Sequence, residues 1–176
     1  RDRLMNFNNA RDAMEHGFAL ITEERKANGL FLKGDLTFNT TIANLEQYKN
    51  GPALSNDKMV RATNKEIKTM HTKCMGPDDL ISSLSGGNQQ KVIFGKWLER
   101  YPQVFLMDEP TRGIDEAARG DVYAVLNKLR ESGVSILLIS SDMEEVVELA
   151  DRAVVMFQGR INSEFKKADI TQDNLM

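Results

Sequence analysis

The sequence predicts an α/β fold in which helices cover a mostly parallel β-sheet. Two short apolar runs, Val134–Ser140 and Ala153–Phe157, have the length and composition of buried strands, and segments with helical periodicity alternate with such runs. Strands that alternate with helices favour a parallel sheet. The chain of 176 residues, 41% hydrophobic and 28% charged, is long enough for one domain with a buried core.

A short helix and a strand are expected first along the chain. Asn9–His16 is typical of a helix, and Gly17 follows at a position that favours a left-handed helix end. The apolar run Phe18–Thr22 then predicts a buried strand. The next segment, Glu23–Gly34, is charged and contains two glycines, so we expect a loop there.

The range 35–83 predicts a small helical insertion rather than an independent domain. Its hydrophobic periodicity is helical but weak, and turn signals interrupt it at Asn50–Pro52 and Gly76–Asp78.

The second half of the chain has the stronger pattern. Pro102 ends its first helix, and Gly133 closes its second. In chain order, the expected elements are a helix at Asn88–Tyr101, a strand at Val104–Met107, a helix at Glu116–Ser132, a strand at Val134–Ser140, a helix at Asp142–Ala150, and strands at Ala153–Phe157 and Arg160–Phe165.

Charge and composition exclude several classes of function. The net charge is −3, from 23 basic and 26 acidic residues, which argues against nucleic acid as the main partner because phosphate backbones require clustered Lys and Arg. The single cysteine, Cys74, forms no internal disulfide and fits a reducing compartment. His16 and His71 lie far apart, so a structural metal site is not expected. No apolar run approaches the ~20 residues that span a bilayer.

Two glycines open the predicted helix that follows Leu84, in the segment LSGGNQQK. Gly86 and Gly87 lack a Cβ, which lets backbone N–H groups approach a ligand closely, and Ser85 adds a hydroxyl donor. Helix N-termini favour anions such as phosphate. A purely structural alternative remains open, in which Ser85 caps the helix and the glycines form a turn.

Adjacent carboxylates end the strand in the segment VFLMDEPT. The carboxyl ends of parallel strands are where α/β sheets place ligands. Asp108 there is suited to hold Mg²⁺ through water, and Glu109 to act as general base on an attacking water. The structural alternative is an acidic turn that Pro110 terminates.

In this order and spacing, the two segments resemble the nucleotide-binding domains of ATP-binding-cassette proteins, from about Ala10 to Ile161. The resemblance implies a P-loop NTPase-like sheet with a helical subdomain at 35–83, and the signature helix, Walker B strand, D-loop and C-terminal strands at 84–165. Asn88 stands where the signature motif usually has glutamine. Asp115, in the D-loop sequence RGID, would contact an opposing domain. The implied nucleotide-binding residues are Ser85, Gly86, Gly87, Asn88 and Gln89.

Three departures from the family pattern affect this chain's own ATP site. The phosphate loop GxxxxGK[ST] is absent from the sequence, and the resemblance would place it before Arg1, so the sheet is expected to lack that strand and helix. Glu23 aligns with the Q-loop glutamine, and Ser141 aligns with the switch histidine, whose charged donor a serine does not replace. This site is therefore expected to be degenerate, and the chain alone inactive.

The segments TEERK, LSGGNQQK, DEPTRGID and ISSDMEEV resemble the second ATP-binding half of bacterial monosaccharide importers of the galactose/methyl-galactoside or ribose type. This implies ATP and Mg²⁺ as cofactors and a peripheral location on the cytoplasmic face of the bacterial membrane. The implied partners are a second cassette, fused or in trans, membrane permease subunits, and indirectly a sugar-binding protein. Apolar residues of the insertion would either form its own core or receive a permease helix; they are Phe31, Leu32, Leu36, Phe38 and Ile42.

Two other functions remain as alternatives. A cassette ATPase that acts on DNA or ribosomes needs basic surfaces or long coiled coils, and the sequence has neither. A non-catalytic interaction module would keep the motifs for dimer contact alone. In either case, a sheet without its phosphate-loop strand is expected to be destabilised or rearranged, and oligomeric through exposed edges.

Overall fold

The computed structural model describes residues 4–176. Its elements, in chain order, are α1 (Ala10–Glu15), β1 (Phe18–Ile21), η1 (Arg25–Gly29), α2 (Leu36–Thr41), η2 (Ile42–Tyr48), β2 (Lys49–Asn50), β3 (Ala53–Leu54), α3 (Asn56–Thr69), η3 (Ile81–Ser83), α4 (Gly86–Leu98), β4 (Val104–Asp108), α5 (Glu116–Glu131), β5 (Ser135–Ile139), α6 (Met143–Leu149), β6 (Arg152–Phe157), β7 (Arg160–Lys166), η4 (Lys167–Asp169) and α7 (Gln172–Leu175). Within residues 4–176, no helix is both long and apolar enough to cross a membrane.

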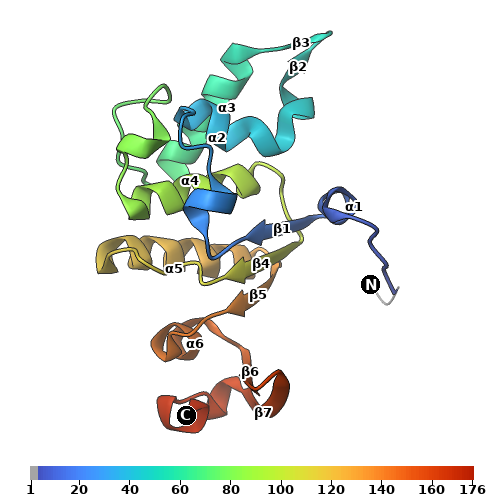
Figure 1. The fold of residues 1–176 in the computed structure, drawn as a ribbon, viewed down its shortest axis with the longest axis vertical. Coiled ribbons are helices and arrows are strands. Elements are labelled where there is room, and N and C mark those ends of the chain that lie inside the picture. The colour runs from blue at the N-terminus through green and yellow to red at the C-terminus, as the bar shows by residue number, and fades with distance from the viewer. Residues whose placement is uncertain (1–3) are drawn as a thin grey trace.

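A three-stranded parallel sheet lies at the centre, in the order β1-β4-β5 (Figure 1). The register is continuous: Leu20 of β1 lies beside Leu106 of β4, which lies beside Leu137 of β5. The α/β fold and the parallel sheet are confirmed. The strands pair in regular register, so the sheet is not rearranged in this structure.

Within the described residues 4–176, helices cover only one face of this sheet. Phe105 and Met107 of β4 are fully buried on that face, where Phe94 of α4 and Val122 of α5 pack in the same core. Side chains of a strand alternate between faces, so the intervening residues point the other way. On that second face, Leu20, Leu137 and Ile139 are 45%, 58% and 54% exposed. The sheet therefore has an apolar face that no helix of residues 4–176 covers.

The range 35–83 folds into helices α2, η2, α3 and η3 with a small exposed hairpin at its outer end, and α2 and α3 pack on α4 (Figure 1). The hairpin β2–β3 turns at Gly51, where the sequence indicates a turn but no strands. Leu36 is fully buried, whereas Phe31 and Phe38 remain 56% and 39% exposed with their rings in edge contact. The boundaries of this range as a unit stay a prediction.

The last two strands lie where the sequence predicts them, but β6 is mostly exposed rather than buried. β6 does not join the parallel sheet but pairs with β7 in a separate antiparallel hairpin. Its turn residues Gln158 and Gly159 both have positive φ, 48° and 75°, which is the backbone of a tight two-residue hairpin turn. That local turn gives β6 its only strand partner among residues 4–176.

Two element boundaries also need correction. The segment Glu23–Gly34, expected as a loop, contains the π-helical turn η1, which packs on α4. The charged sequence of η1 has no apolar periodicity that would predict it. The helix expected at Asn88–Tyr101 begins earlier, at Gly86, because Ser85 caps it, and ends at Leu98.

Candidate functional site

Ser85 is the exposed N-cap of the 13-residue helix α4. Its Oγ accepts hydrogen bonds from the backbone N–H of Asn88 at 3.5 Å and from the Asn88 Nδ2 at 2.9 Å. Ser85 thus caps the helix, as the purely structural alternative predicts. It does not conflict with ligand binding, because the first N–H groups of a helix point away from its body and toward an anion.

Gly86 and Gly87 lie against protein rather than against open space. A Cβ on Gly86 would come within 2.6 Å of the Arg25 Nη2 and 3.3 Å of the Gly113 carbonyl oxygen. A Cβ on Gly87 would come within 2.5 Å of the Ala118 Cβ. Close packing against Ala118 of α5 therefore requires glycine at position 87, whereas at position 86 the nearest neighbour is the end of the Arg25 side chain.

The next two residues of the signature motif, Asn88 and Gln89, form hydrogen bonds with backbone groups near the loop. Asn88 accepts a hydrogen bond from the backbone N–H of Lys73 at 2.8 Å. Gln89 is 4% exposed, and its Nε2 donates to the carbonyls of Ile81 and Leu84 at 3.2 and 3.1 Å. Gln89 thus lies inside the protein. A direct contact with a nucleotide would require it to lie on the surface.

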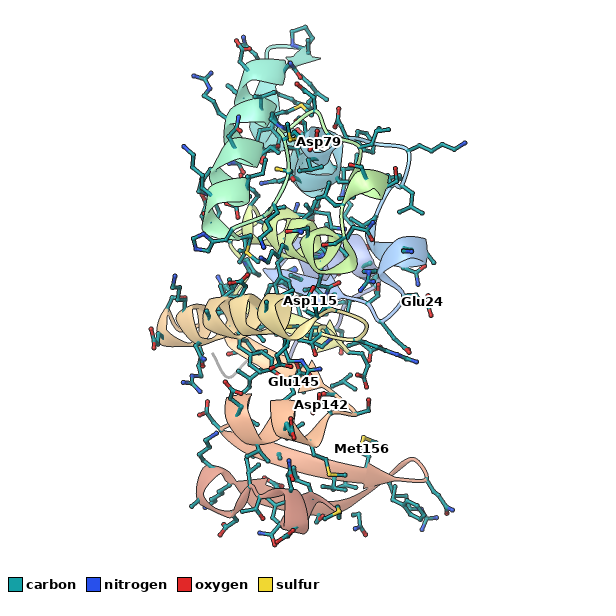
Figure 2. The ribbon with its side chains drawn as sticks, turned by 90° about the vertical axis from the view of Figure 1, so that its left-hand side faces the viewer. Glu24, Asp79, Asp115, Asp142, Glu145 and Met156 are labelled. Atoms are coloured by element: carbon teal, nitrogen blue, oxygen red, sulfur yellow. The ribbon has the colours of Figure 1, made fainter. Side chains whose placement is uncertain are left out.

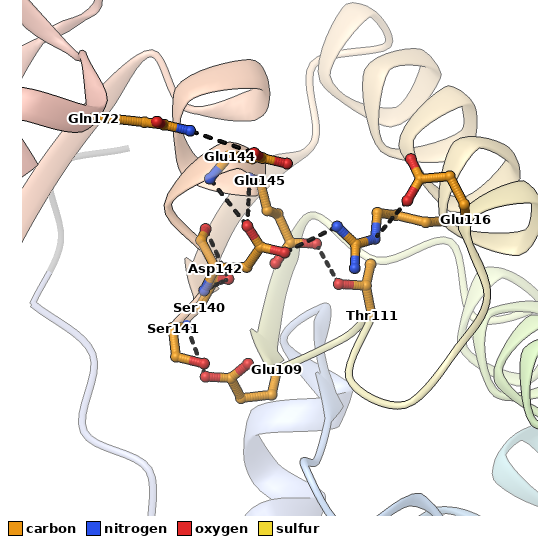
Figure 3. A network of polar contacts seen from close by, with 10 residues as sticks. Glu109, Thr111, Glu116, Ser140, Ser141, Asp142, Glu144, Glu145 and Gln172 are labelled. Carbon is orange, nitrogen blue, oxygen red and sulfur yellow. Dashed lines mark hydrogen bonds and ion pairs between the residues drawn. The ribbon is translucent and has the colours of Figure 1, made fainter.

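Asp108 and Glu109 follow at the carboxyl end of β4. Asp108 lies beside Ile139 of β5, in register, and is half-buried. Glu109 has a positive φ of 48°, and its backbone N–H donates to the Ile139 carbonyl at 2.9 Å. Its Oε1 accepts a hydrogen bond from the Ser141 N–H at 2.7 Å (Figure 3). The structure therefore joins the predicted general base to the switch position.

A polar network that the motifs do not predict lies beside this pair. Thr111 donates its hydroxyl to the Oε1 of Glu145 at 2.9 Å, and Glu145 is fully buried (Figure 3). Burial raises the pKa of the Glu145 carboxyl. Asp142 caps α6 and accepts from Arg119 of α5 at 2.9 Å. Figure 2 shows Asp142 and Glu145 on the side of α5 that faces away from α4.

Asp115 and Glu23, the remaining predicted positions, lie close to the signature loop. Asp115 caps α5 by accepting from the Ala118 N–H at 2.9 Å, and its Oδ2 lies 3.5 Å from the Cβ position of Gly87. Glu23 forms an ion pair with Arg112 of the D-loop sequence. A pocket of about 220 Å³ opens there, lined by Glu23, Glu24, Arg25, Lys26 and Arg112. The predicted residues thus fall into two groups, one around Gly86 and one around Glu109.

The described residues do not by themselves fit a magnesium nucleotide. Between residues 4 and 176, no group of three or more His, Cys, Asp or Glu residues is arranged to hold a metal ion. Asp108 supplies a single carboxylate, and the sequence contains no GxxxxGK[ST] loop to hold the phosphates. No step through a metal can therefore be derived from this chain alone.

Comparison with known proteins gives close relatives in sequence. The galactose/methyl galactoside import ATP-binding protein of Treponema denticola is 48% identical over 175 residues, which are 99% of this chain and 35% of that protein. The protein of the same name in Escherichia coli K12 is 41% identical over 173 residues, 98% of this chain and 34% of that protein. The chain spans about a third of the length of these relatives. No protein-family profile matches the chain.

Solved structures share the fold at low identity. The ATP-binding cassette MJ0796 bound to ADP and Pi aligns with a TM-score of 0.75 at 18% identity, over 92% of this chain and 68% of that one. MJ1267, an ATP-binding cassette of an ABC transporter, aligns with a TM-score of 0.72 at 21% identity, over 90% of this chain and 65% of that one. In sequence and in fold, the chain therefore belongs to the ATP-binding-cassette proteins, and it is homologous to a region of the galactose/methyl galactoside import ATP-binding proteins.

Proposed function

We propose that this chain supplies the signature loop to an ATP site whose phosphate loop lies on another cassette, within the ATPase of a bacterial sugar importer. The observation that carries the proposal is the exposed start of α4, with Ser85 at its tip and the D-loop beside it, in a sequence without a phosphate loop of its own. The chain therefore has one half of a nucleotide site.

The chemistry of this half site is anion recognition. The Ser85 hydroxyl and the N–H groups of Gly86 and Gly87 donate to phosphate oxygens, and the partial positive charge at the start of α4 adds to the attraction. Gln89 takes no direct part, since it holds the carbonyls of Ile81 and Leu84 and so fixes the loop. Asn88 also helps to fix the loop, because it accepts a hydrogen bond from the backbone N–H of Lys73.

In this proposed arrangement, the site of Asp108 and Glu109 contributes little to ATP hydrolysis. Asp108 would supply one carboxylate for Mg²⁺, through water, and the other groups that hold the metal would come from outside the described residues. Glu109 orients a water. Ser141 contributes only a backbone donor, and no imidazole stands at its position to contact a γ-phosphate. The signature loop is thus the main contribution of the chain to ATP hydrolysis.

The relatives' names support the proposed partners and location. Those proteins are named for import of galactose and methyl galactoside, so a permease and, indirectly, a sugar-binding protein are the proposed partners. The proposed location is the cytoplasmic face of the membrane. The exposed apolar residues Phe31 and Phe38, next to η1, support a protein contact on that side of the chain.

ATP-dependent association tests the proposal. The partner polypeptide for the test is the part of the Treponema denticola relative that this chain does not match, which the proposal expects to carry a phosphate loop. We expect MgATP to strengthen association in sedimentation velocity experiments. Ser85→Asp should abolish the effect, because aspartate still caps the helix but repels phosphate. Ser55→Asp is the matched control, since Ser55 caps α3 in the same way, away from the site.

Association that MgATP does not change, or that Ser85→Asp leaves intact, would contradict the proposal. Binding independent of ATP and of Ser85 would instead favour a non-catalytic interaction module.

A further inference from the structure

One arginine side chain contacts both loops that flank the proposed nucleotide surface. Arg25, the first residue of η1, donates from Nη1 to the Arg112 carbonyl at 3.1 Å and from Nη2 to the Gly113 carbonyl at 3.4 Å. The same guanidinium covers Gly86, where an added Cβ would lie 2.6 Å from Nη2 and 3.2 Å from Cζ. Arg25 thus lies between the signature loop and the D-loop backbone.

The position of Arg25 is fixed from both ends of η1. Before it, Glu23 pairs with Arg112, so the segment and the D-loop are also joined side chain to side chain. After it, the carbonyl of Gly29 accepts a hydrogen bond from the Lys96 Nζ at 2.6 Å, and Lys96 is 8% exposed on α4. The η1 turn therefore lies along α4 and is held near its start and near its end.

The chemistry of these contacts requires arginine. The planar guanidinium reaches two neighbouring carbonyls with separate donors while the same group lies against Gly86. A lysine ammonium is a point charge on a flexible stem and does not fill both roles. Nothing in the nucleotide proposal assigns a role to Arg25.

We infer that Arg25 is a positioning residue that holds Gly86 and the Arg112–Gly113 backbone together, so that the signature loop and the D-loop present one surface to the nucleotide. The expected effect on nucleotide binding rests on the proposed function, whereas the contact of Arg25 with the two loops does not depend on it. Arg25 acts through the two loops and is not a ligand of the nucleotide.

Hydrogen exchange of the isolated chain tests the contact without any nucleotide. We expect Arg25→Met to raise amide exchange in residues 84–90 and 111–118 by about tenfold, since both loops lose a shared anchor. Arg25→Lys should give a smaller rise, and Lys26→Met, on the exposed neighbouring residue, should give none. If Arg25→Met lowers overall protection, Arg25→Lys decides the test, because it keeps the stem and the charge.

A double-mutant cycle separates positioning from general stability. In Gly86→Ala, the new methyl group displaces the guanidinium, so adding Arg25→Met should change exchange in residues 111–118 little further. Additive effects of the two substitutions, or unchanged exchange in Arg25→Met, would overturn the inference.

The role in nucleotide binding is tested by the ATP-dependent association with the partner polypeptide. Arg25→Met should weaken it by about tenfold, with partial rescue in Arg25→Lys and full association in Lys26→Met. Normal association of Arg25→Met would also overturn the inference. If the wild-type chain shows no ATP-dependent association, the proposed function fails, and the exchange data still decide whether Arg25 joins the two loops.

Discussion

The carboxylate of Glu109 accepts a hydrogen bond from the backbone N–H of Ser141 at 2.7 Å. Glu109 follows β4 and Ser141 follows β5, so this bond joins the carboxyl ends of two neighbouring strands. Since the donor is a backbone group, the side chain at position 141 does not control the bond. The bond orients the Glu109 side chain in this structure.

We therefore expect no measurable ATP hydrolysis by the chain alone. An oriented Glu109 has no phosphate loop to bring ATP to it, so Glu109→Gln should release phosphate from MgATP at the same background rate as the wild-type chain. A coupled phosphate-release assay measures this. A rate above background that disappears in Glu109→Gln would show a working site within these residues.

Packing at the signature loop predicts a large effect of one methyl group. A Cβ at Gly87 would lie 2.5 Å from the Ala118 Cβ, so α4 and α5 must separate in Gly87→Ala. We expect a loss of about 1–3 kcal/mol in the free energy of unfolding, measured by urea denaturation. The matched control is Gly120→Ala in α5, where no atom lies within 4 Å of the added Cβ. Removing a helical glycine there should stabilise by up to about 1 kcal/mol. Equal effects of the two substitutions would contradict this packing.

A buried acid pair between α3 and the end of α4 predicts a pH dependence of stability. Glu66 and Glu99 are 5% and 2% exposed, and a single cation, the Nζ of Lys65, contacts them at 3.2 and 2.9 Å. Tyr48 donates to Glu99 at 2.8 Å. Burial, with only this one cation beside the two carboxylates, raises the pKa of Glu66 to about 7.

The sign of the effect follows from this raised pKa. The folded pKa of Glu66 lies above its ordinary value of 4.5, so its contribution to stability is complete below pH 4.5 and is lost as the pH rises to about 7. Each tenfold gain in proton affinity on folding corresponds to about 1.4 kcal/mol. Urea denaturation at several pH values should show this fall in the wild-type chain. Glu66→Gln, which mimics the protonated acid, should reduce it. A decline of the same size in Glu66→Gln would assign it to other groups.

The uncovered face of the central sheet predicts self-association of the chain. Leu137 of β5 is 58% exposed in a row with Leu20 and Leu106, and contiguous apolar surface of this kind favours contact between molecules. Leu137→Thr should shift sedimentation toward the monomer. Leu54→Thr serves as the control, because Leu54 is similarly exposed, at 46%, but lies on the β2–β3 hairpin. A wild-type chain that is monomeric at all concentrations would contradict the prediction.

Local patterns in the sequence predict much of this fold. The strand ending at Asp108 and the helix that Ser85 caps are recognisable because apolar runs and capping residues are neighbours in the chain. The motifs likewise predict the order of the candidate site residues. The pairing of Glu109 with Ser141, 32 residues apart, follows from the parallel sheet, although no motif specifies the bond itself.

Contacts between distant segments are what the sequence does not reveal. Arg25 lies in a charged stretch that is typical of a loop, and its bond to the Arg112 carbonyl spans 87 residues. The glycines at 86 and 87 suggest room for a ligand, yet the same absence of a Cβ serves packing against Arg25 and Ala118. Gln89 has the polarity of a surface residue, and only the carbonyls of Ile81 and Leu84 explain its burial.

Asp108 shares the uncovered face of the sheet with Leu106, and the register places it beside Ile139. A segment that packs on those apolar side chains would therefore also displace water from around the Asp108 carboxylate. In the lower dielectric that results, the attraction between this carboxylate and a cation becomes stronger. Covering of the apolar face and the change in the surroundings of Asp108, the proposed metal ligand, would then be a single event.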